Sequence, residues 1–321
     1  AASDVYKRQL RVDSMGYAFY QPDKIYTKKE GCSMEKAKVY FTKELTPEAM
    51  ERMYRVLGSG LSGETAVKVH SGEMGNQNFI RPDFMKKVIE AVNGTVVECN
   101  TAYEGKRNTT KEHWETMKAH GWTEHFRVDI MDEDGELELP VEGGKQISVN
   151  YVGKNLQNYD SILVLSHFKG HPMGGFGGAL KNISIGIASS HGKAHIHGAG
   201  YPEAMWTAEH DSFLEAMADA AKSIVAYRKN HIAFLNVMCN MSVDCDCCAV
   251  AEDPKMADIG ILSSLDPVAL DQACLDLVYS SEDPGKKDLI KRIESRNGVH
   301  TVEAAAEIGV GSREYELICI D

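Results

Sequence analysis

Long apolar runs and a positive charge balance are both missing from this 321-residue chain. No apolar run approaches the ~18–20 residues of a membrane-spanning helix, so we expect no contact with a membrane interior. The formal net charge of −12 argues against nucleic-acid partners and anionic membrane surfaces. The N-terminal segment lacks the apolar core of a secretory signal, so we expect a reducing, cytoplasmic location.

Cysteines are also sparse, at eight, which excludes a disulfide framework in a chain of this length. The spacing CxxCxxCxxxC that binds ferredoxin clusters is absent. Four cysteines are scattered, whereas Cys239 and the DCDCC segment over 244–248 form a cluster. This cluster is therefore the part of the cysteine content that points to a metal or to redox chemistry.

Strand-like and helix-like segments alternate from about residue 37 onward, with loops of a few residues between them. This alternation predicts an α/β fold, with a mostly parallel or mixed sheet and helices on both faces. We expect a single domain over residues 34–321, and a long helix over 203–228 within it. Residues 1–33 show no clear period, so we interpret them as a non-native leader outside the domain, with the native start at Met34.

The stretch over residues 166–198 directly follows a predicted strand and contains five histidines, three lysines and many glycines. Imidazole, ammonium and backbone N–H groups at one strand end suit a metal or an anionic ligand better than an ordinary core. We take Lys169, His171 and Lys181 as catalytic candidates. If the backbone is extended, His195 and His197 share one face.

A glycine-rich segment within this stretch loosely resembles a phosphate cradle, in which backbone N–H groups converge on an anion. It matches neither the P-loop nor the dinucleotide pattern, and a tight backbone crossing explains the glycines equally well. As candidate ligand-binding residues it offers Gly174, Gly175, Gly177, Gly178 and Asn182.

Two further polar loops follow predicted strands, and ligands of open α/β sheets bind at the carboxyl ends of strands. Polar loops are also the default after any strand, so a purely structural role stays open for both. The candidate ligand-binding residues are Glu73, Asn76 and Arg81 after His70, and Asn100 and Arg107 after Cys99.

The DCDCC segment offers Cys245, Cys247 and Cys248 as metal ligands, with a histidine completing the shell. On an extended backbone, Cys245 and Cys247 point the same way. We expect iron or zinc, with nitrogen from His197 or His171. A surface loop with incidental thiols remains an alternative, as does a redox or nucleophilic cysteine, which the neighbouring carboxylates oppose by raising the thiol pKa.

Several motifs in one order resemble the domain of unknown function 362 family, often labelled as uncharacterised iron–sulfur centre proteins. The resemblance covers roughly residues 36–279 and implies an α/β domain of unassigned chemistry. Many relatives carry a ferredoxin-like insert between the positions of His197 and His231, and this chain resembles a short form without it. The motifs are KVHSGEMGNQNFIRP at 68–82, NTAYEGKRN at 100–108, FKGHPMGGFGGALKN at 168–182, HGKAHIHG at 191–198, NMSVDCDCC at 240–248 and DIGILSSLDPVALDQA at 258–273.

Together these features favour a metal or iron–sulfur-associated Cys/His site that performs redox or metal-assisted chemistry on a small anionic molecule. One alternative is a metal-independent enzyme or ligand-binding domain that binds phosphate or carboxylate through the glycine segment and lysines. A second is a partner subunit of an iron–sulfur electron-transfer protein. Neither nucleic acid nor a membrane is an expected partner.

Overall fold

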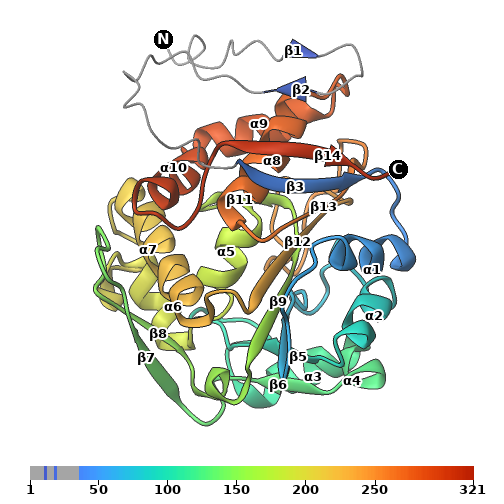
Figure 1. Ribbon diagram of the computed structural model, residues 1–321. Coiled ribbons are helices and arrows are strands. Elements are labelled where there is room, and N and C mark those ends of the chain that lie inside the picture. Colours follow the sequence, from blue (N-terminus) through green and yellow to red (C-terminus); the bar gives the residue numbers. More distant parts are fainter. Residues whose placement is uncertain (1–10, 13–17, 20–35) are drawn as a thin grey trace.

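An eight-stranded sheet lies at the centre of the computed structural model, which describes residues 11–12, 18–19 and 36–321. The strand order is β14-β3-β13-β12-β9-β4-β5-β6 (Figure 1). The predicted leader over 1–33 lies outside the described residues, apart from β1 (Arg11–Val12) and β2 (Ala18–Phe19). The eight strands are β3 (Ala37–Thr42), β4 (Thr65–Lys68), β5 (Thr95–Glu98), β6 (Val128–Ile130), β9 (Ser161–His167), β12 (Ile232–Met238), β13 (Gly260–Ser264) and β14 (Tyr315–Cys319).

The sheet is mostly parallel, as predicted, because only β13 runs antiparallel to its neighbours β12 and β3. Every residue of β9 and β12 is buried. Strands that are covered by helices on both faces need apolar side chains on both faces, which explains the nearly continuous apolar sequences SILVLSH and IAFLNVM. The predicted α/β fold class is confirmed.

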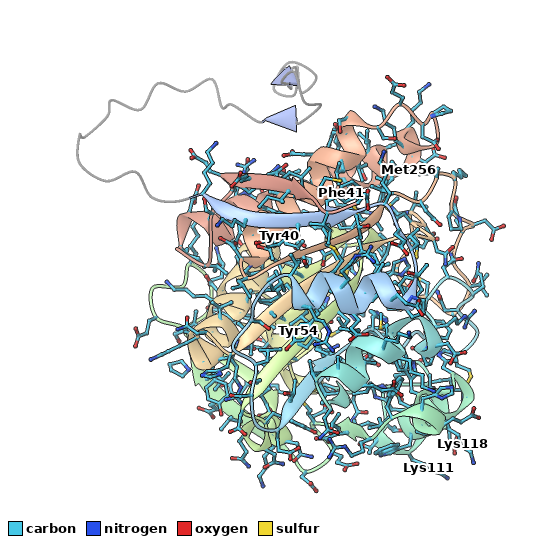
Figure 2. The ribbon with its side chains drawn as sticks, turned by 45° about the vertical axis from the view of Figure 1, so that its right-hand side comes forward. Tyr40, Phe41, Tyr54, Lys111, Lys118 and Met256 are labelled. Atoms are coloured by element: carbon cyan, nitrogen blue, oxygen red, sulfur yellow. The ribbon has the colours of Figure 1, made fainter. Side chains whose placement is uncertain are left out.

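Helices cover both faces of the sheet, and each face has its own apolar core. Tyr40 and Phe41 are adjacent in β3 yet contribute to cores on opposite faces, as the alternation of a strand requires (Figure 2). One face is covered by α1 (Pro47–Arg55), α2 (Pro82–Ala91), α3 (Thr110–Ala119) and α4 (Trp122–His125). The other is covered by α5 (Ala179–Ser184), α7 (His210–Arg228), α8 (Pro267–Ser280), α9 (Lys286–Ser295) and α10 (Val299–Glu307).

The remaining elements lie beside this sandwich. A hairpin pairs β7 (Glu136–Pro140) with β8 (Val149–Gly153), and a smaller one pairs β10 (Lys169–His171) with β11 (Gly175–Gly177). The short helices are η2 (Lys154–Asn158), α6 (Ser190–His197) and η3 (Pro202–Ala204). None of the helices in the described part of the chain combines the length and apolar character needed to span a bilayer.

The predicted start of the long helix over 203–228 was wrong, because α7 begins at His210. The side chain of Glu209 accepts the Ser212 N–H at 2.7 Å and so caps the helix. The residues before it form η3 and an irregular segment instead. Two residues with positive φ, Ala199 (49°) and Gly200 (101°), turn the chain immediately after α6.

The sheet has a topological switch point between β4 and β9, which are adjacent and parallel. After β4 the chain continues to β5 on one side, and after β9 it continues to β12 on the other. The connecting helices α2 and α7 cover opposite faces, so a crevice opens at the carboxyl ends of these strands.

Candidate active site

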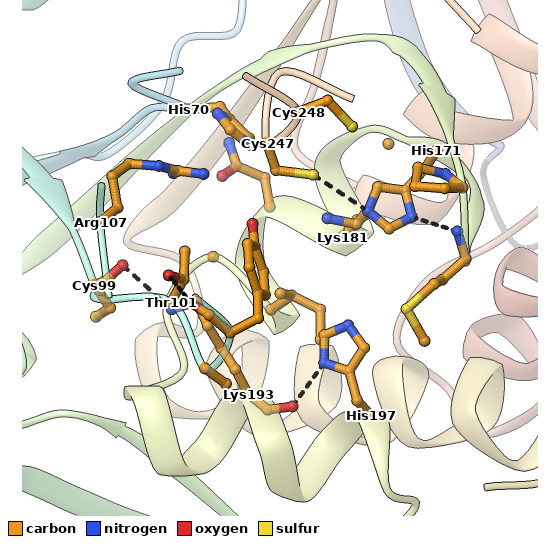
Figure 3. A pocket seen from close by; sticks show the side chains of 18 of the residues that line it. His70, Cys99, Thr101, Arg107, His171, Lys181, Lys193, His197, Cys247 and Cys248 are labelled. Carbon is orange, nitrogen blue, oxygen red and sulfur yellow. Dashed lines mark hydrogen bonds between the residues drawn. The ribbon is translucent and has the colours of Figure 1, made fainter. Parts of the chain in front are cut away.

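A cavity of about 330 Å³ occupies this crevice (Figure 3). The segments that follow β4, β5, β9 and β12 all contribute to its wall, although they are far apart in sequence. The structure thus brings the histidine-rich stretch and the cysteine cluster together. The sequence-predicted residues that line the cavity are Arg107, Lys169, His171, Gly177, Gly178, Lys181, Asn182, His197, Cys247 and Cys248.

Two thiols and one imidazole converge beside this cavity. The Nε2 atom of His171 and the Sγ atoms of Cys245 and Cys247 all lie within 4.8 Å of one another. The distance from Cys247 Sγ to His171 Nε2 is 3.9 Å (Figure 3). The cysteines lie in a compact loop, not on an extended strand, and Cys247 donates its N–H to Cys245 Sγ at 3.4 Å. Ligands of one tetrahedral metal ion with bonds of about 2.0–2.3 Å are about 3.3–3.8 Å apart, and the 3.9 Å between Cys247 and His171 is close to this separation.

A second imidazole, that of His70, lies on the other side of the sulfurs. Its Nε2 is 3.8 Å from Cys245 Sγ, and its Nδ1 accepts the Gly72 N–H at 3.2 Å. His171 has the same arrangement, because its Nδ1 accepts the N–H groups of Met173 at 3.1 Å and Gly174 at 2.9 Å. In the neutral form each ring therefore carries its proton on Nε2, facing a sulfur.

His197 is oriented in the opposite sense. Its Nδ1 donates to the Lys193 carbonyl at 2.7 Å, which leaves the Nε2 lone pair directed into the cavity (Figure 3). A backbone carbonyl that fixes Nδ1–H in this way is typical of histidines that bind metals or accept protons through Nε2. Burial lowers the pKa of His70, His171 and His197 to about 4, so all three imidazoles are neutral at pH 7.

His195 and His197 would share one face only on an extended backbone, and that condition is not met, because both lie on α6. Residues two positions apart are separated by about 200° around a helix axis, so these two side chains point to nearly opposite sides. His195 contacts the Tyr151 ring at 5.1 Å outside the cavity, whereas His197 stacks on Phe213 at 4.9 Å. His197 lies outside the group formed by His171 and the two sulfurs.

A buried ionic cluster lies between the two cysteines. The Asp246 carboxylate, which is 1% exposed, accepts from His167 Nδ1 and Lys169 Nζ, each at 2.9 Å. Burial alone would raise the pKa of Asp246, but His167 and Lys169 hold it well below its ordinary value. Asp244 likewise pairs with Arg292 at 3.2 Å. The flanking carboxylates are thus matched by cations, which weakens the sequence-based argument that they oppose reactive thiols.

The cysteine loop is held against the hairpin and the loop after β4. The N–H of Gly170 donates to the Ser242 carbonyl at 2.8 Å, and a Cβ at Gly170 would lie 2.2 Å from the Val243 oxygen. Asn76 donates to the Cys248 carbonyl at 2.8 Å, and the Glu73 N–H donates to the Asp246 carbonyl at 2.8 Å. Glu73 and Asn76, predicted as ligand-binding residues, therefore hold the loop in place and do not line the cavity.

Two other predicted ligand-binding residues also lie outside the cavity. The guanidinium of Arg81 is exposed and lies 4.0 Å from the centre of the Phe79 ring. Asn100 is buried, with its side chain bonded to Thr110 at 2.9 Å and to His113 at 3.1 Å. Both residues are satisfied by partners within the protein.

The position of Asp271 argues against the interpretation of the glycine segment as a phosphate cradle. Its buried carboxylate accepts the N–H groups of Ala179 and Leu180 at 2.8 and 2.9 Å, so the protein's own anion occupies the start of α5. A Cβ at Gly178 would lie 2.4 Å from Asp271, which explains that glycine. Gly174 lies in the β10–β11 turn, and Gly175, the first residue of β11, packs against Gly298.

Positive charge exceeds negative charge along the cavity wall. Lys68 pairs with Glu98 at 2.7 Å, and Arg107 pairs with Glu73 at 3.1 Å. By contrast, Lys181 and Lys193 form no ion pair with any carboxylate among the described residues, although both line the cavity. Lys193 donates only to backbone carbonyls, of which Ala188 is the nearer at 2.6 Å. Burial lowers the pKa of Lys193, and an anion bound beside it would stabilise its charged form.

Several residues of the site were missed by sequence reasoning. His70 and His167 stand at the ends of β4 and β9, and a histidine directly after a predicted strand is the signal that points to them. The other missed residues are buried charged side chains that contact residues far away in the sequence, so no local pattern points to them. These residues are Lys68, Glu98, Lys193 and Asp246.

Comparisons with known proteins identify a family but no function. The model of the domain of unknown function DUF362 matches residues 65–276. No curated protein matches the chain. Eight chains of solved structures match. Among them is the lactate racemase apoprotein from Thermoanaerobacterium thermosaccharolyticum, with 15% identity and a TM-score of 0.39, covering 98% of this chain and 88% of that one. A Thermotoga maritima protein gives 13% identity and a TM-score of 0.38, covering 81% of this chain and 58% of that one.

Proposed function

We propose that this chain, which belongs to the DUF362 family, is a cytoplasmic metalloprotein that performs redox or metal-assisted chemistry on a small anionic molecule. The observation that carries the proposal is the group of His171, Cys245 and Cys247 at the wall of a cavity rich in cations. Two thiolates with one imidazole favour iron or zinc. Three protein ligands with a further position open toward a cavity are typical of catalytic metal sites, in which the metal polarises a substrate or activates water.

The remaining residues of the cavity supply complementary roles. Lys181 and Lys193 provide charge for the anion, since neither has a carboxylate partner among the described residues. His197 presents a free Nε2 and is held in that tautomer, so it suits the acceptance of a proton from the bound molecule. Cys248 lines the cavity beside the metal group and remains a candidate fourth ligand.

A metal-independent function is the second candidate, and one observation favours it. The Nδ1 atoms of His70 and His171 accept backbone N–H groups, so each Nε2–H is placed to donate to a cysteine sulfur. A metal bound at Nε2 would have to displace that proton. In this alternative the lysines hold phosphate or carboxylate, and His197 is the base.

Anion binding with and without a chelator separates the two candidates. Phosphate and small carboxylates are expected to raise the melting temperature of anaerobically purified protein, and removal of the metal is expected to reduce that increase. An increase that is the same after chelation would favour the metal-independent candidate. Absence of any increase with either preparation would contradict both.

Replacement of Lys181 by glutamine is expected to weaken phosphate binding by about 10–100-fold, because one charge-assisted hydrogen bond contributes about 1.5–3 kcal/mol. Isothermal titration calorimetry measures this loss. The matched control is Lys111→Gln, since Lys111 is exposed on α3 (Figure 2) and does not line the cavity. Equal affinities for the Lys181 and Lys111 variants would remove Lys181 from the site.

A further inference from the structure

A second cavity of about 390 Å³ adjoins the first. Five residues line both cavities and so form the passage between them: Pro172, Met173, His197, Met205 and Trp206. The outer cavity is completed by Ala208, His210, Phe213 and Arg296. A molecule that extends past His197 from the inner cavity therefore enters the outer one.

The inner cavity and the passage differ in chemistry. The inner cavity carries the ammonium groups of Lys181 and Lys193 together with the sulfur group. The passage, by contrast, is formed mainly by apolar side chains, those of Met173, Met205 and Trp206. Beyond the passage the outer cavity has Ala208 and Phe213 together with His210 and Arg296, so the apolar part of a ligand is matched by the passage itself.

Trp206 is the most informative residue of the passage. It is 66% exposed, which is unusual for so large an apolar side chain. Within the described part of the chain, its indole makes no ring contact and no hydrogen bond. Apolar area left uncovered at the mouth of a binding cavity gains free energy when a ligand covers it.

We propose that the substrate is an amphipathic organic anion, with its charged head between Lys181 and Lys193 and its alkyl or aryl tail against Met173, Met205 and Trp206. This inference rests on the proposed function, because it places the head in the same cavity. A head group such as phosphate or acetate alone leaves the outer cavity unfilled, whereas a tail of several carbons occupies it. The tail thus determines specificity, and the head determines the position of the reacting end.

The test is calorimetric titration of the as-purified full chain with acetate, butanoate, hexanoate and octanoate. Affinity is expected to rise by about threefold to fourfold per methylene until the outer cavity is full, which corresponds to about 0.8 kcal/mol per buried CH₂. The Trp206→Ala variant is expected to bind hexanoate at least fivefold more weakly than the parent chain does. Its affinity for acetate is expected to be unchanged.

The matched control is Tyr201→Ala, because Tyr201 is also 66% exposed but lines neither cavity. This variant is expected to bind every acid as the parent does. Equal affinity for all four acids overturns the tail site while leaving the proposed function intact. If affinity still rises with the length of the acid in Trp206→Ala as it does in the parent, the tail site is likewise overturned and the proposed function is left intact. If no acid binds at all, both the tail site and the proposed anion site fail.

Discussion

Replacement of Cys245 and Cys247 together by serine is expected to reduce the metal content from about one ion per chain to background. The two sulfurs are two of the three ligand atoms within 4.8 Å of one another, and serine is a poor ligand for iron or zinc. Loss of a single hydrogen-bonded neighbour of a ligand already weakens metal binding by about 10–100-fold, so loss of two ligands exceeds that. Elemental analysis of anaerobically purified protein measures the change.

A matched variant, Cys319→Ser, controls for the removal of thiols as such, because Cys319 is exposed on β14. It is expected to keep the parent metal content. Thermal unfolding of the double variant establishes that the domain remains folded, since Cys245 is 1% exposed and its replacement removes some buried apolar surface. A folded double variant that retains one metal ion would show that the metal is bound elsewhere.

Replacement of Glu98 by glutamine is expected to lower the free energy of unfolding by about 3–5 kcal/mol, the cost of leaving a buried charge without its partner. Glu98 is 3% exposed, and its Oε2 lies 2.7 Å from Lys68 Nζ. Its other oxygen accepts the Ser71 N–H at 2.7 Å. Glutamine keeps the shape and one acceptor but leaves the Lys68 ammonium uncompensated. Urea unfolding at pH 7 measures the loss.

The dependence of this loss on pH follows from the pKa of Glu98. Burial alone would raise that pKa, but Lys68 and the neighbouring cations hold it below its ordinary value of 4.5. The unfolded chain therefore takes up the proton first, and the contribution of Glu98 is complete above about pH 4.5 and declines as the pH falls further. The difference in the free energy of unfolding between the parent chain and Glu98→Gln is therefore expected to become smaller as the pH falls below about 4.5.

A second variant separates the charge from the shape. Adding Lys68→Met to Glu98→Gln removes the unpaired ammonium, so part of the lost stability is expected to return. If the double variant is as unstable as Glu98→Gln alone, the cost lies in packing around Glu98 and not in the charge of Lys68.

The sequence predicted the fold well because the sheet is built from local signals. Buried strands such as SILVLSH are largely apolar. Thr46 and Pro47 are residue types that start helices, and the Thr46 side chain accepts the Ala49 N–H at 3.1 Å at the start of α1. The start of α7 was missed because a short turn at Pro202–Ala204 precedes its cap. A helical pattern of apolar residues does not show where the first hydrogen bond forms.

The site was predictable in its segments but not in its pairings. The sequence did not show whether the histidines of α6 lie on an extended backbone or on a helix, since a glycine-rich run carries little helical pattern. A phosphate cradle was one of two interpretations of Gly174–Gly178, but the N–H groups that follow this segment bind Asp271, about ninety residues away, which local reasoning does not show. Glu73 and Asn76 had the residue types of a ligand site, yet they fix the cysteine loop. Such outcomes depend on tertiary contacts that no local pattern encodes.

The central claim is that Cys245, Cys247 and His171 bind one metal ion at the wall of the cationic cavity. X-ray absorption at the metal edge of anaerobically purified protein tests it most directly. We expect two sulfur neighbours at about 2.3 Å and at least one nitrogen at about 2.0–2.1 Å. A spectrum with only oxygen and nitrogen neighbours, unchanged by Cys245→Ser with Cys247→Ser, would contradict it.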